Sequence, residues 1–380
     1  MNDFLTIIGA GLAGSEAAWQ AAERGIPVVL YEMRSVSRTA AHKTDGCAEL
    51  VCSNSLGNNL PHSAPYILKE ELRSFNSIVI SSGDHNSVPA GSALAVDRDL
   101  FSEEITEKIS NHPLITLKRQ EIVEIPQSGP VIIATGPLTS PKLSEEISRL
   151  IGQEYLYFYD ALSPIVDANS IDYDKAFFAS RYGKGDADYL NCPMDENQYY
   201  NFIKELNAAE KVPMASFEKP VYFEGCMPIE VLAERGPKTL AFGPLKPVGL
   251  PDPITGKIAF AVVQLRKENK ESSAYNLVGF QTKLTYPEQK RIVRMIPGLE
   301  NAEFFRLGAI HRNTFIDTPS LLSNQLQLKS RPDIYFAGQI TGVEGYVESA
   351  SMGLLASLSA VAEITGKDYM PPPRDTALGA

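Results

Sequence analysis

Four cysteines are the residues of this sequence with the clearest potential for covalent chemistry. Cys47 and Cys52 stand five positions apart, Cys192 follows much later, and Cys226 directly precedes Met227-Pro228. A proline there suits the first turn of a helix, so we expect Cys226 just before a helix N-terminus. The helix dipole and free N–H groups at such a position favour the nucleophilic thiolate. From spacing alone, a functional thiol and a buried structural thiol are equally good interpretations of Cys226.

The pair Cys47 and Cys52 has three interpretations. Its spacing and its place near the N-terminus are those of the redox disulfide in flavin disulfide reductases. Those enzymes also need a second glycine fingerprint for the nicotinamide in mid-chain, and residues 155–240 contain no G-x-G-x-x-G. A metal site would favour a closer C-x-x-C pair. Inert core thiols are therefore the leading interpretation, and we expect no metal site.

The N-terminal residues have the pattern of a dinucleotide-binding βαβ unit. An apolar run over residues 4–8 predicts a buried strand, residues 15–24 predict a helix, and residues 26–31 predict a second strand that closes on an acid. The glycines allow a tight turn and close approach of backbone N–H groups to a pyrophosphate, while the acid can accept from a ribose hydroxyl. The residues concerned are Gly9, Ala10, Gly11, Leu12, Ala13, Gly14 and Glu32. An S-adenosylmethionine site built on a similar turn is the alternative.

A second set of signals lies near the other end of the chain. A strand over residues 333–336 runs into Gly338 and Gln339, and Gly345 precedes an apolar helix over residues 347–364. Another buried strand is expected at residues 130–134. Strands at the two extremes of a chain, with a long insert between them, are what a two-part flavin domain requires. The pattern resembles flavoproteins of the glutathione-reductase type, so FAD is favoured over NAD.

The predicted fold class is α/β, with a glutathione-reductase-type FAD-binding Rossmann domain that is discontinuous in sequence and an inserted α+β domain. We expect the FAD-binding domain at residues 1–154 and 305–380 and the inserted substrate domain at residues 155–304. Residues 38–65 lack periodicity and suit an irregular active-site loop. Helices are expected at residues 100–110, capped by Asp99, and at residues 144–151, 228–235 and 286–295.

Composition excludes several classes of protein. The chain has 380 residues, 44% of them apolar and 21% charged, which is the globular range. No basic, apolar leader opens the chain, and no apolar run reaches the roughly 18 residues of a spanning helix. Four cysteines in a chain of this length suit a reducing compartment. We therefore expect a cytoplasmic protein with no membrane partner.

Charge is unevenly distributed along the chain. The net charge is -11, but residues 238–312 contain twelve Lys and Arg against six Asp and Glu, so this segment is +6 and the remainder is -17. Such asymmetry indicates a local surface for a polyanion on an otherwise acidic body. A scattered, solvated face is an equally good interpretation until the residues are placed in space.

Motifs across nearly the whole chain resemble those of the folate-dependent tRNA (uracil-5-)-methyltransferases. The glycine turn is shared with many flavoproteins, whereas the cysteine, Lys-Pro and His-Arg-Asn motifs are specific to this group. The matching segments are residues 9–18, 51–55, 96–98, 223–230, 243–250, 261–266, 276–282, 310–315 and 338–346.

The resemblance implies an enzyme that binds FAD, takes a methylene from 5,10-methylenetetrahydrofolate, takes electrons from NADPH or NADH, and makes ribothymidine in the tRNA T-loop. Uracil C5 is a poor nucleophile, and a thiolate that adds at C6 converts the ring to an enolate able to attack a one-carbon electrophile. Family precedent gives that role to Cys226. Cys52 would assist near the flavin as a proton acceptor or partner thiol.

The resemblance also suggests roles for polar residues. His311 would stack on the folate pterin against the flavin, and Arg312 and Lys246 would hold anionic groups of folate or RNA. Without the resemblance, a satisfied core histidine is the better interpretation of His311. The basic segment would grip the T-arm by its phosphates, and we single out Lys283, Lys290 and Arg291 for tRNA binding. No DNA partner is expected.

Other functions fit parts of the sequence. A related, larger flavoprotein group that modifies the tRNA wobble uridine shares the glycine motif, but its long C-terminal helical region has no counterpart here. The same chemistry on ribosomal RNA, a disulfide reductase that uses Cys47 and Cys52, and a noncatalytic FAD-bound RNA-binding protein stay open. Members of the methyltransferase family continue some tens of residues beyond the position of Ala380, which suggests a truncated chain or a dispensable terminal piece.

Overall fold

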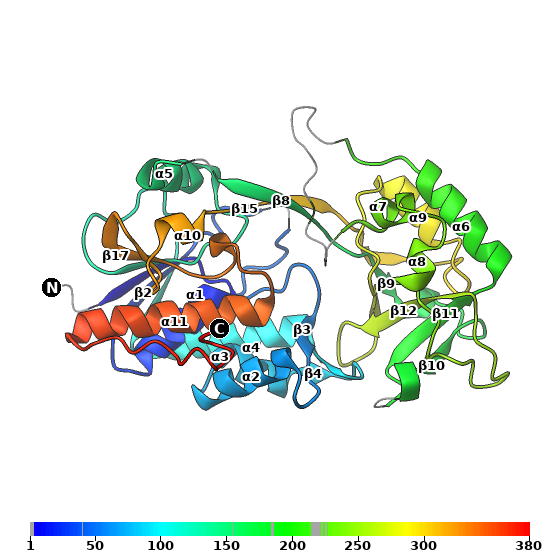
Figure 1. The fold of residues 1–380 in the computed structure, drawn as a ribbon, viewed down its shortest axis with the longest axis horizontal. Coiled ribbons are helices and arrows are strands. Elements are labelled where there is room, and N and C mark those ends of the chain that lie inside the picture. The colour runs from blue at the N-terminus through cyan, green and yellow to red at the C-terminus, as the bar shows by residue number, and fades with distance from the viewer. Residues whose placement is uncertain are drawn as a thin grey trace.

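Two lobes joined by a two-stranded ribbon make up the protein (Figure 1). The computed structural model describes residues 4–39, 41–153, 155–183, 186–213, 222, 225 and 227–380. Each lobe is built around a six-stranded sheet with its own apolar core. The two lobes therefore have separate cores, and they contact each other beside the ribbon as well, for example where Arg306 meets Cys52.

The first lobe contains the predicted βαβ unit. Its main sheet has the order β16-β17-β7-β1-β2-β6, and all neighbouring strands run parallel except β16 and β17. The strands are β1 Leu5–Ile8, β2 Val28–Glu32, β6 Ile115–Arg119, β7 Val131–Ile133, β16 Gln327–Leu328 and β17 Arg331–Phe336. Strands from both ends of the chain thus lie in one sheet, as the sequence predicts for the flavin-type domain.

Helices and a small sheet surround this core. The helices are α1 Leu12–Ala22, α2 Ala64–Ser74, α3 Ile78–His85, α4 Arg98–Asn111, α5 Pro141–Ile151, α10 Thr318–Leu321 and α11 Tyr346–Thr365. A three-stranded antiparallel sheet has the order β3-β5-β4, formed by β3 Ser55–Asn58, β4 Ser87–Val88 and β5 Ala93–Val96. A short 3-10 turn, Gln339–Thr341, follows β17 in this lobe, and two others, Ala168–Ser170 and Arg181–Gly183, belong to the inserted part of the chain.

The second lobe is the inserted part, with strand order β10-β11-β12-β13-β9-β14. Its strands are β9 Ile165–Asp167, β10 Phe177–Ala179, β11 Tyr189–Met194, β12 Ala261–Lys267, β13 Ala274–Leu277 and β14 Phe304–Arg306. Its helices are α6 Glu196–Ala208, α7 Ile229–Glu234, α8 Thr239–Phe242 and α9 Tyr286–Val293. The mixture of antiparallel strands and helices is an α+β arrangement.

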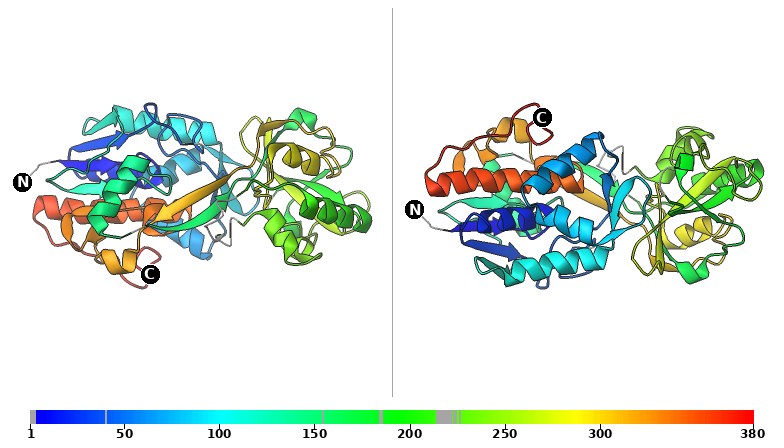
Figure 2. Two further views of the ribbon diagram at one scale, coloured as in Figure 1. Left: turned by 90° about the horizontal axis from the view of Figure 1, so that it is seen from above. Right: turned by 90° about the horizontal axis from the view of Figure 1, so that it is seen from below.

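The ribbon pairs β8 Leu156–Ala161 with β15 Ile310–Phe315, antiparallel along its whole length. Both views in Figure 2 show this ribbon crossing from one lobe to the other. Because it carries the chain out of the first lobe and back, it places residues of β15 beside residues of the nucleotide-binding turns.

Helix α11 is long and apolar enough to cross a membrane by length and composition, with 61% of its best window buried. Its environment is that of a core helix. Gly353 packs so closely on α1 that an added Cβ would lie 2.1 Å from the Ala13 carbonyl oxygen. Ser357 also donates a hydrogen bond to the carbonyl oxygen of Ala17 at 2.9 Å. Small residues at this crossing let the two helices lie in contact.

Several helix ends differ from the prediction, with α5 starting three residues early at Pro141, and three further differences concern caps and the predicted loop. Helix α4 is capped by Asp97, whose side chain accepts from the N–H groups of Asp99 and Leu100, so Asp99 lies inside the first turn. Helix α7 begins at Ile229 with Pro228 as its N-cap rather than in its first turn. The span 38–65 is only partly irregular, because it contains β3 and the start of α2. The first two differences are of one or two residues at helix starts, where sequence signals are weakest, whereas the third is a missed strand and the first residues of a helix.

Candidate functional site

One pocket in the first lobe is lined by both nucleotide-binding signals. The turn after β1, the end of β2, the end of β7 and the turn after β17 all contribute to it. Of the ten residues predicted to bind a cofactor, those that line the pocket are Gly9, Gly11, Leu12, Ala13, Glu32, Gly338 and Gln339. The pocket's lining does not include Ala10, Gly14 or Gly345.

The three glycines of the first turn have different tasks. Gly9 has a φ of +100°, and an added Cβ would lie 2.6 Å from the carbonyl oxygen of Ala134. A Cβ on Gly14 would lie 1.7 Å from the carbonyl oxygen of Gly9, so this glycine allows α1 to begin against β1. Nothing lies within 4 Å of a Cβ on Gly11. The first and third glycines serve packing, whereas Gly11 leaves open space at the helix N-terminus for a bound group.

Glu32 is buried at the end of β2 and fixes the turn. Its carboxylate accepts from the N–H of Ala10 at 2.9 Å and from the Arg34 guanidinium at 2.8 and 3.0 Å. Burial alone would raise the pKa of Glu32, but the hydrogen bonds and charge of Arg34 hold that pKa below its ordinary value. The N–H of Arg34 donates to the same carboxylate at 3.0 Å, so Glu32 accepts four hydrogen bonds, about as many as an ionised carboxylate can take, and a ribose hydroxyl would have to share one of these sites.

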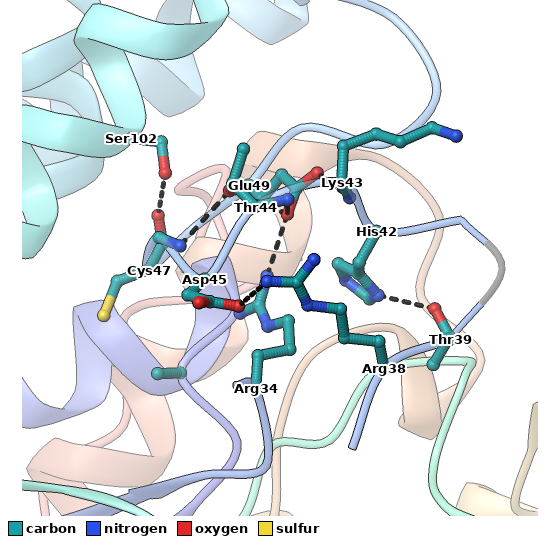
Figure 3. Close-up of polar contacts among 12 residues, drawn as sticks. Arg34, Arg38, Thr39, His42, Lys43, Thr44, Asp45, Cys47, Glu49 and Ser102 are labelled. Atoms are coloured by element: carbon teal, nitrogen blue, oxygen red, sulfur yellow. Dashed lines mark hydrogen bonds and ion pairs between the residues drawn. The ribbon is translucent and has the colours of Figure 1, made fainter. Parts of the chain in front are cut away.

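A second carboxylate, Glu49, accepts hydrogen bonds within a loop that contributes His42 and Glu49 to the lining of the pocket (Figure 3). It accepts from Arg34 Nη1 at 3.2 Å, from the N–H of Lys43 at 2.7 Å, and from the hydroxyl of Thr44 at 3.0 Å. His42 in the same loop lies 2.6 Å from the Thr39 hydroxyl. Arg34, His42 and Glu49 line the pocket and are absent from the sequence prediction. An arginine two residues after the acid at the strand end is the one local signal that could have indicated this cluster.

The described thiols lie in different environments. Cys47 is fully buried, its sulfur points away from the Arg34–Glu49 cluster in Figure 3, and burial raises its pKa. Cys192 is fully buried in the second lobe, where burial raises its pKa to about 12. Cys52 is half-buried, and its N–H donates to the hydroxyl of Tyr346, a pocket residue, at 2.8 Å.

Cys226 lies outside the described residues. Two described residues, one before it and one after it in sequence, contact the ribbon and the second lobe. Tyr222 forms an isolated bridge with Tyr159 of β8, and the N–H of Ile229 donates to the carbonyl oxygen of Gln281 at 2.7 Å.

The environment of Cys47 bears on the redox-pair interpretation. Its low exposure and its raised pKa argue against a redox pair with Cys52.

The ribbon strand β15 carries two of the predicted substrate residues on opposite faces. His311 is half-buried, its Nε2 is buried without a hydrogen-bond partner among the described residues, and burial followed by the charges of Arg306 and Lys43 lowers its pKa. A buried, unpaired ring nitrogen fits a missing ligand. Arg312 stacks 4.4 Å above the ring of Tyr157 and lines a second cavity beside the first. Lys246 lies in a turn after α8.

The predicted tRNA-binding residues cluster around α9. Lys290 and Arg291 are exposed on this helix, and Arg291 pairs with Glu205 and Glu288 at 2.6 and 2.7 Å. Lys283 donates to the Tyr222 hydroxyl at 2.7 Å and lies 5.2 Å above the ring of Tyr222. The twelve basic residues of segment 238–312 are therefore not equally available to a polyanion.

The fold and the pocket define a flavoprotein of the Rossmann type. A family model described as Glucose inhibited division protein A matches residues 5–368. Two crystal forms of Aquifex aeolicus GidA superpose with a TM-score of 0.73 at 18% identity; the match covers 98% of this chain and 65 to 67% of theirs.

Closer relatives come from curated proteins. The methylenetetrahydrofolate–tRNA-(uracil-5-)-methyltransferase TrmFO of Citrifermentans bemidjiense is 61% identical over 381 residues, covering 100% of this chain and 87% of that protein. The TrmFO proteins of Heliobacterium modesticaldum and Enterococcus faecalis are 61% and 60% identical, covering 99% and 100% of this chain and 86% and 87% of theirs. The chain belongs to this methyltransferase family.

Proposed function

We propose that this protein methylates C5 of the T-loop uridine in tRNA, with 5,10-methylenetetrahydrofolate as the carbon donor and FAD reduced by NADPH or NADH. The observation that carries the proposal is the match of about 60% identity, over the full chain, to enzymes named for this reaction. The pocket of the first lobe, with Cys52 and His311 near it, supports the same assignment.

The first-lobe pocket fits FAD. Gly11 leaves room at the N-terminus of α1 for a pyrophosphate, Glu32 lines the pocket for a ribose hydroxyl, and Gly338 and Gln339 line its other end. When bound, the flavin supplies the electrons that turn a methylene into a methyl group, and the folate supplies the carbon. The half-buried ring of His311 would stack on the pterin, while Arg312 and Lys246 would hold anionic groups of folate or RNA.

Cys226 would add to C6 of the target uracil. Addition of the thiolate converts the ring to an enolate, which makes C5 nucleophilic, and loss of the C5 proton later expels the sulfur. Cys52, on the loop beside the pocket, would accept or return a proton. This division gives the reactive chemistry to Cys226 and to the half-buried Cys52, and none to Cys47 or Cys192, which are buried in the apolar cores.

The second lobe would grip the T-arm. Lys283, Lys290 and Arg291 lie on or near α9, where phosphate contacts would position the arm, and the target base would leave its stack to reach Cys226. We propose that the inserted domain spans residues 155–304, a range that includes the ribbon strand β8 and ends before its partner β15. We also propose a cytoplasmic location, which agrees with three free thiols among the described residues.

The test is an anaerobic assay of the FAD-bound protein with NADPH, methylenetetrahydrofolate and unmodified tRNA, followed by nucleoside analysis for 5-methyluridine. Cys226→Ala should lower product at least about a thousandfold, because the nucleophile is lost. Cys192→Ala is the matched control, since that thiol is buried in the core of the second lobe and has no proposed role, and it should retain product. Absence of product from the parent, or product from Cys226→Ala, would overturn the proposal.

A further inference from the structure

Side chains from both lobes donate hydrogen bonds to the main chain of the loop that carries Cys52. Arg98 Nη2 donates to the carbonyl oxygen of Cys52 at 3.2 Å, and Arg306 Nη2 donates to the same oxygen at 3.1 Å. Arg306 Nη1 also donates to the carbonyl oxygen of Val51 at 3.1 Å, and Arg98 Nη1 donates to that of Leu50. Two guanidinium groups thus converge on one peptide oxygen.

The other side of the same peptide is fixed as well. The N–H groups of Cys52 and Ser53 donate to the hydroxyl of Tyr346, at 2.8 and 3.2 Å. Because the contacts on both sides of Cys52 hold its backbone, rotation of the side chain is the main freedom left to the thiol. Asn54, two residues later, accepts from Arg266 at 2.8 Å and donates to the carbonyl oxygen of Lys267 at 2.9 Å.

These partners come from opposite lobes. Arg98 opens α4 in the first lobe, whereas Arg306 ends β14 in the second lobe, 254 residues from Cys52. Glu268, directly after β12, is nearly buried and pairs with the Arg98 guanidinium. Docking of the second lobe on the first therefore also sets the position of the Cys52 loop.

Charged groups are concentrated at this junction. Two guanidinium groups and one carboxylate meet around the loop, and burial together with the charge of Arg98 lowers the pKa of Arg306 to about 10, so Arg306 stays charged at neutral pH. Arg306 Nε is buried and has no hydrogen-bond partner among the described residues. Arg306 is half-buried, and a largely desolvated charge that is kept for two carbonyl contacts suggests a role beyond packing, because an apolar side chain would cost less to desolvate.

We propose that Arg306 is a positioning residue, which holds the Cys52 loop against the flavin pocket and couples the placement of the second lobe to that thiol. The inference rests on the proposed function for the role of Cys52, but the geometry of the clamp can be tested separately. Lysine at position 306 would keep the charge and lose the fork that reaches two carbonyl oxygens at once.

The experiment compares Arg306→Met, Arg306→Lys and Arg331→Met in the FAD-bound protein. Arg331 is a matched control because its guanidinium also contacts a carbonyl oxygen, that of Pro126, and a carboxylate, that of Asp333, away from Cys52. Hydrogen exchange of residues 50–54 and of β1 reports local and global protection, and the kcat and KM for tRNA report function.

Arg306→Met should speed hydrogen exchange at residues 50–54 at least about tenfold and leave the exchange rates of β1 unchanged. The same variant should lower kcat at least about tenfold, while its KM for tRNA stays within about twofold of the parent value. Arg306→Lys should fall between this variant and the parent, and Arg331→Met should match the parent. Unchanged exchange at residues 50–54, or an unchanged kcat despite faster exchange, would overturn the inference. A parent that makes no product contradicts the proposed function instead, and exchange alone then decides whether the clamp exists.

Discussion

At the scale of single residues, burial separates thiols that the sequence presents as alike. Cys47 lies in the core of the first lobe with a raised pKa, whereas Cys52 is half-buried beside the pocket. Because the thiolate is the reactive form and must be reached by solvent, reactivity should follow exposure.

Brief treatment of the folded protein with iodoacetamide should therefore label Cys52 at least about tenfold faster than Cys47. Both cysteines fall in one tryptic peptide, so fragment-ion mass spectrometry distinguishes the two sites. The urea-unfolded protein is the control, in which both should react. Equal labelling in the folded protein would contradict the assigned environments and reopen the redox-pair interpretation.

Glu344 is a second residue whose surroundings set its chemistry. Its two oxygens accept from the Gln339 amide at 3.1 and 3.3 Å, and burial, with a smaller effect of nearby Asp160, raises its pKa to about 7. The folded state thus binds its proton more tightly than the unfolded state, whose carboxyl has a pKa near 4.5. Stability should fall as pH rises from 4.5 through 7 and then stay level.

Glu344→Gln should remove that part of the pH dependence. After allowance for partial exposure, we expect the variant to gain about 1 kcal/mol relative to the parent at pH 8 and nothing at pH 4.5. Thermal unfolding of parent and variant at the two pH values measures the difference. An equal change in Tm at both values would show that the carboxyl is not perturbed.

At the scale of elements, close helix contacts explain why small residues recur in α1 and α11. Gly353→Ala would place a methyl group 2.1 Å from the Ala13 carbonyl oxygen, so α11 must move away from α1. We expect a loss of about 1–3 kcal/mol of unfolding free energy, typical of overpacking. Chemical denaturation measures this loss.

Gly11→Ala is the contrasting change, because its Cβ meets nothing within 4 Å and Gly11 has an ordinary φ of -71°. This variant should fold like the parent and bind FAD more weakly, since the methyl group enters the pocket. A loss of stability in Gly11→Ala but not in Gly353→Ala would contradict the packing role of Gly353 and the ligand-binding role of Gly11.

Helix α4 is fastened to α3 by Glu104, which contacts Lys108 at 2.6 Å, His85 at 3.0 Å and Asn86 at 2.6 Å. Burial would raise the pKa of Glu104, but these partners lower it to about 2. The resulting stability is present above the unfolded value near 4.5 and is lost as pH falls through 2.

Glu104→Gln should cost about 1 kcal/mol at pH 7, and less as the pH approaches 2. Glu107→Gln is the control, because Glu107 is exposed on the same helix. Urea unfolding at a series of pH values compares the three proteins. A Glu104→Gln loss that did not shrink toward low pH would contradict the ionic origin of the effect.

The sequence predicted those elements whose signals are local. The glycine turn, the acid at Glu32 and the paired strands near both ends of the chain each occupy a few consecutive residues, so their structures follow from short-range patterns. The small sheet of β3, β4 and β5 was missed because β3 (Ser-Leu-Gly-Asn) and β4 (Ser-Val) contain no apolar run like those of β1 and β7. The contact of Arg306 with Cys52 could not be predicted, since it depends on how two lobes dock.

At the scale of the whole molecule, only those basic groups of residues 238–312 that face solvent can contact a polyanion. Arg306 is engaged at the lobe junction, and Arg266 is held by Asn54, so the surface of the second lobe is less basic than the segment total suggests. Lys290, exposed on α9, is the better candidate for a phosphate contact.

Lys290→Glu should therefore weaken tRNA binding and reduce the slope of log Kd against log salt by about 1. Lys142→Glu, on α5 of the first lobe, is an exposed control of the same type and should leave the slope unchanged. Filter binding at several salt concentrations gives both slopes. An unchanged slope for Lys290→Glu would place the tRNA elsewhere on the molecule.

The source and destination of the methyl carbon test the central claim most directly. Unmodified tRNA would be incubated anaerobically with the FAD-bound protein, NADPH and methylenetetrahydrofolate labelled with 13C in its methylene group. The tRNA would then be digested with a nuclease, and mass spectrometry would measure the masses of the fragments. The proposed function predicts one labelled methyl on the T-loop uridine, and none when S-adenosylmethionine replaces the folate. Label on another nucleotide, or methylation supported by S-adenosylmethionine, would contradict it.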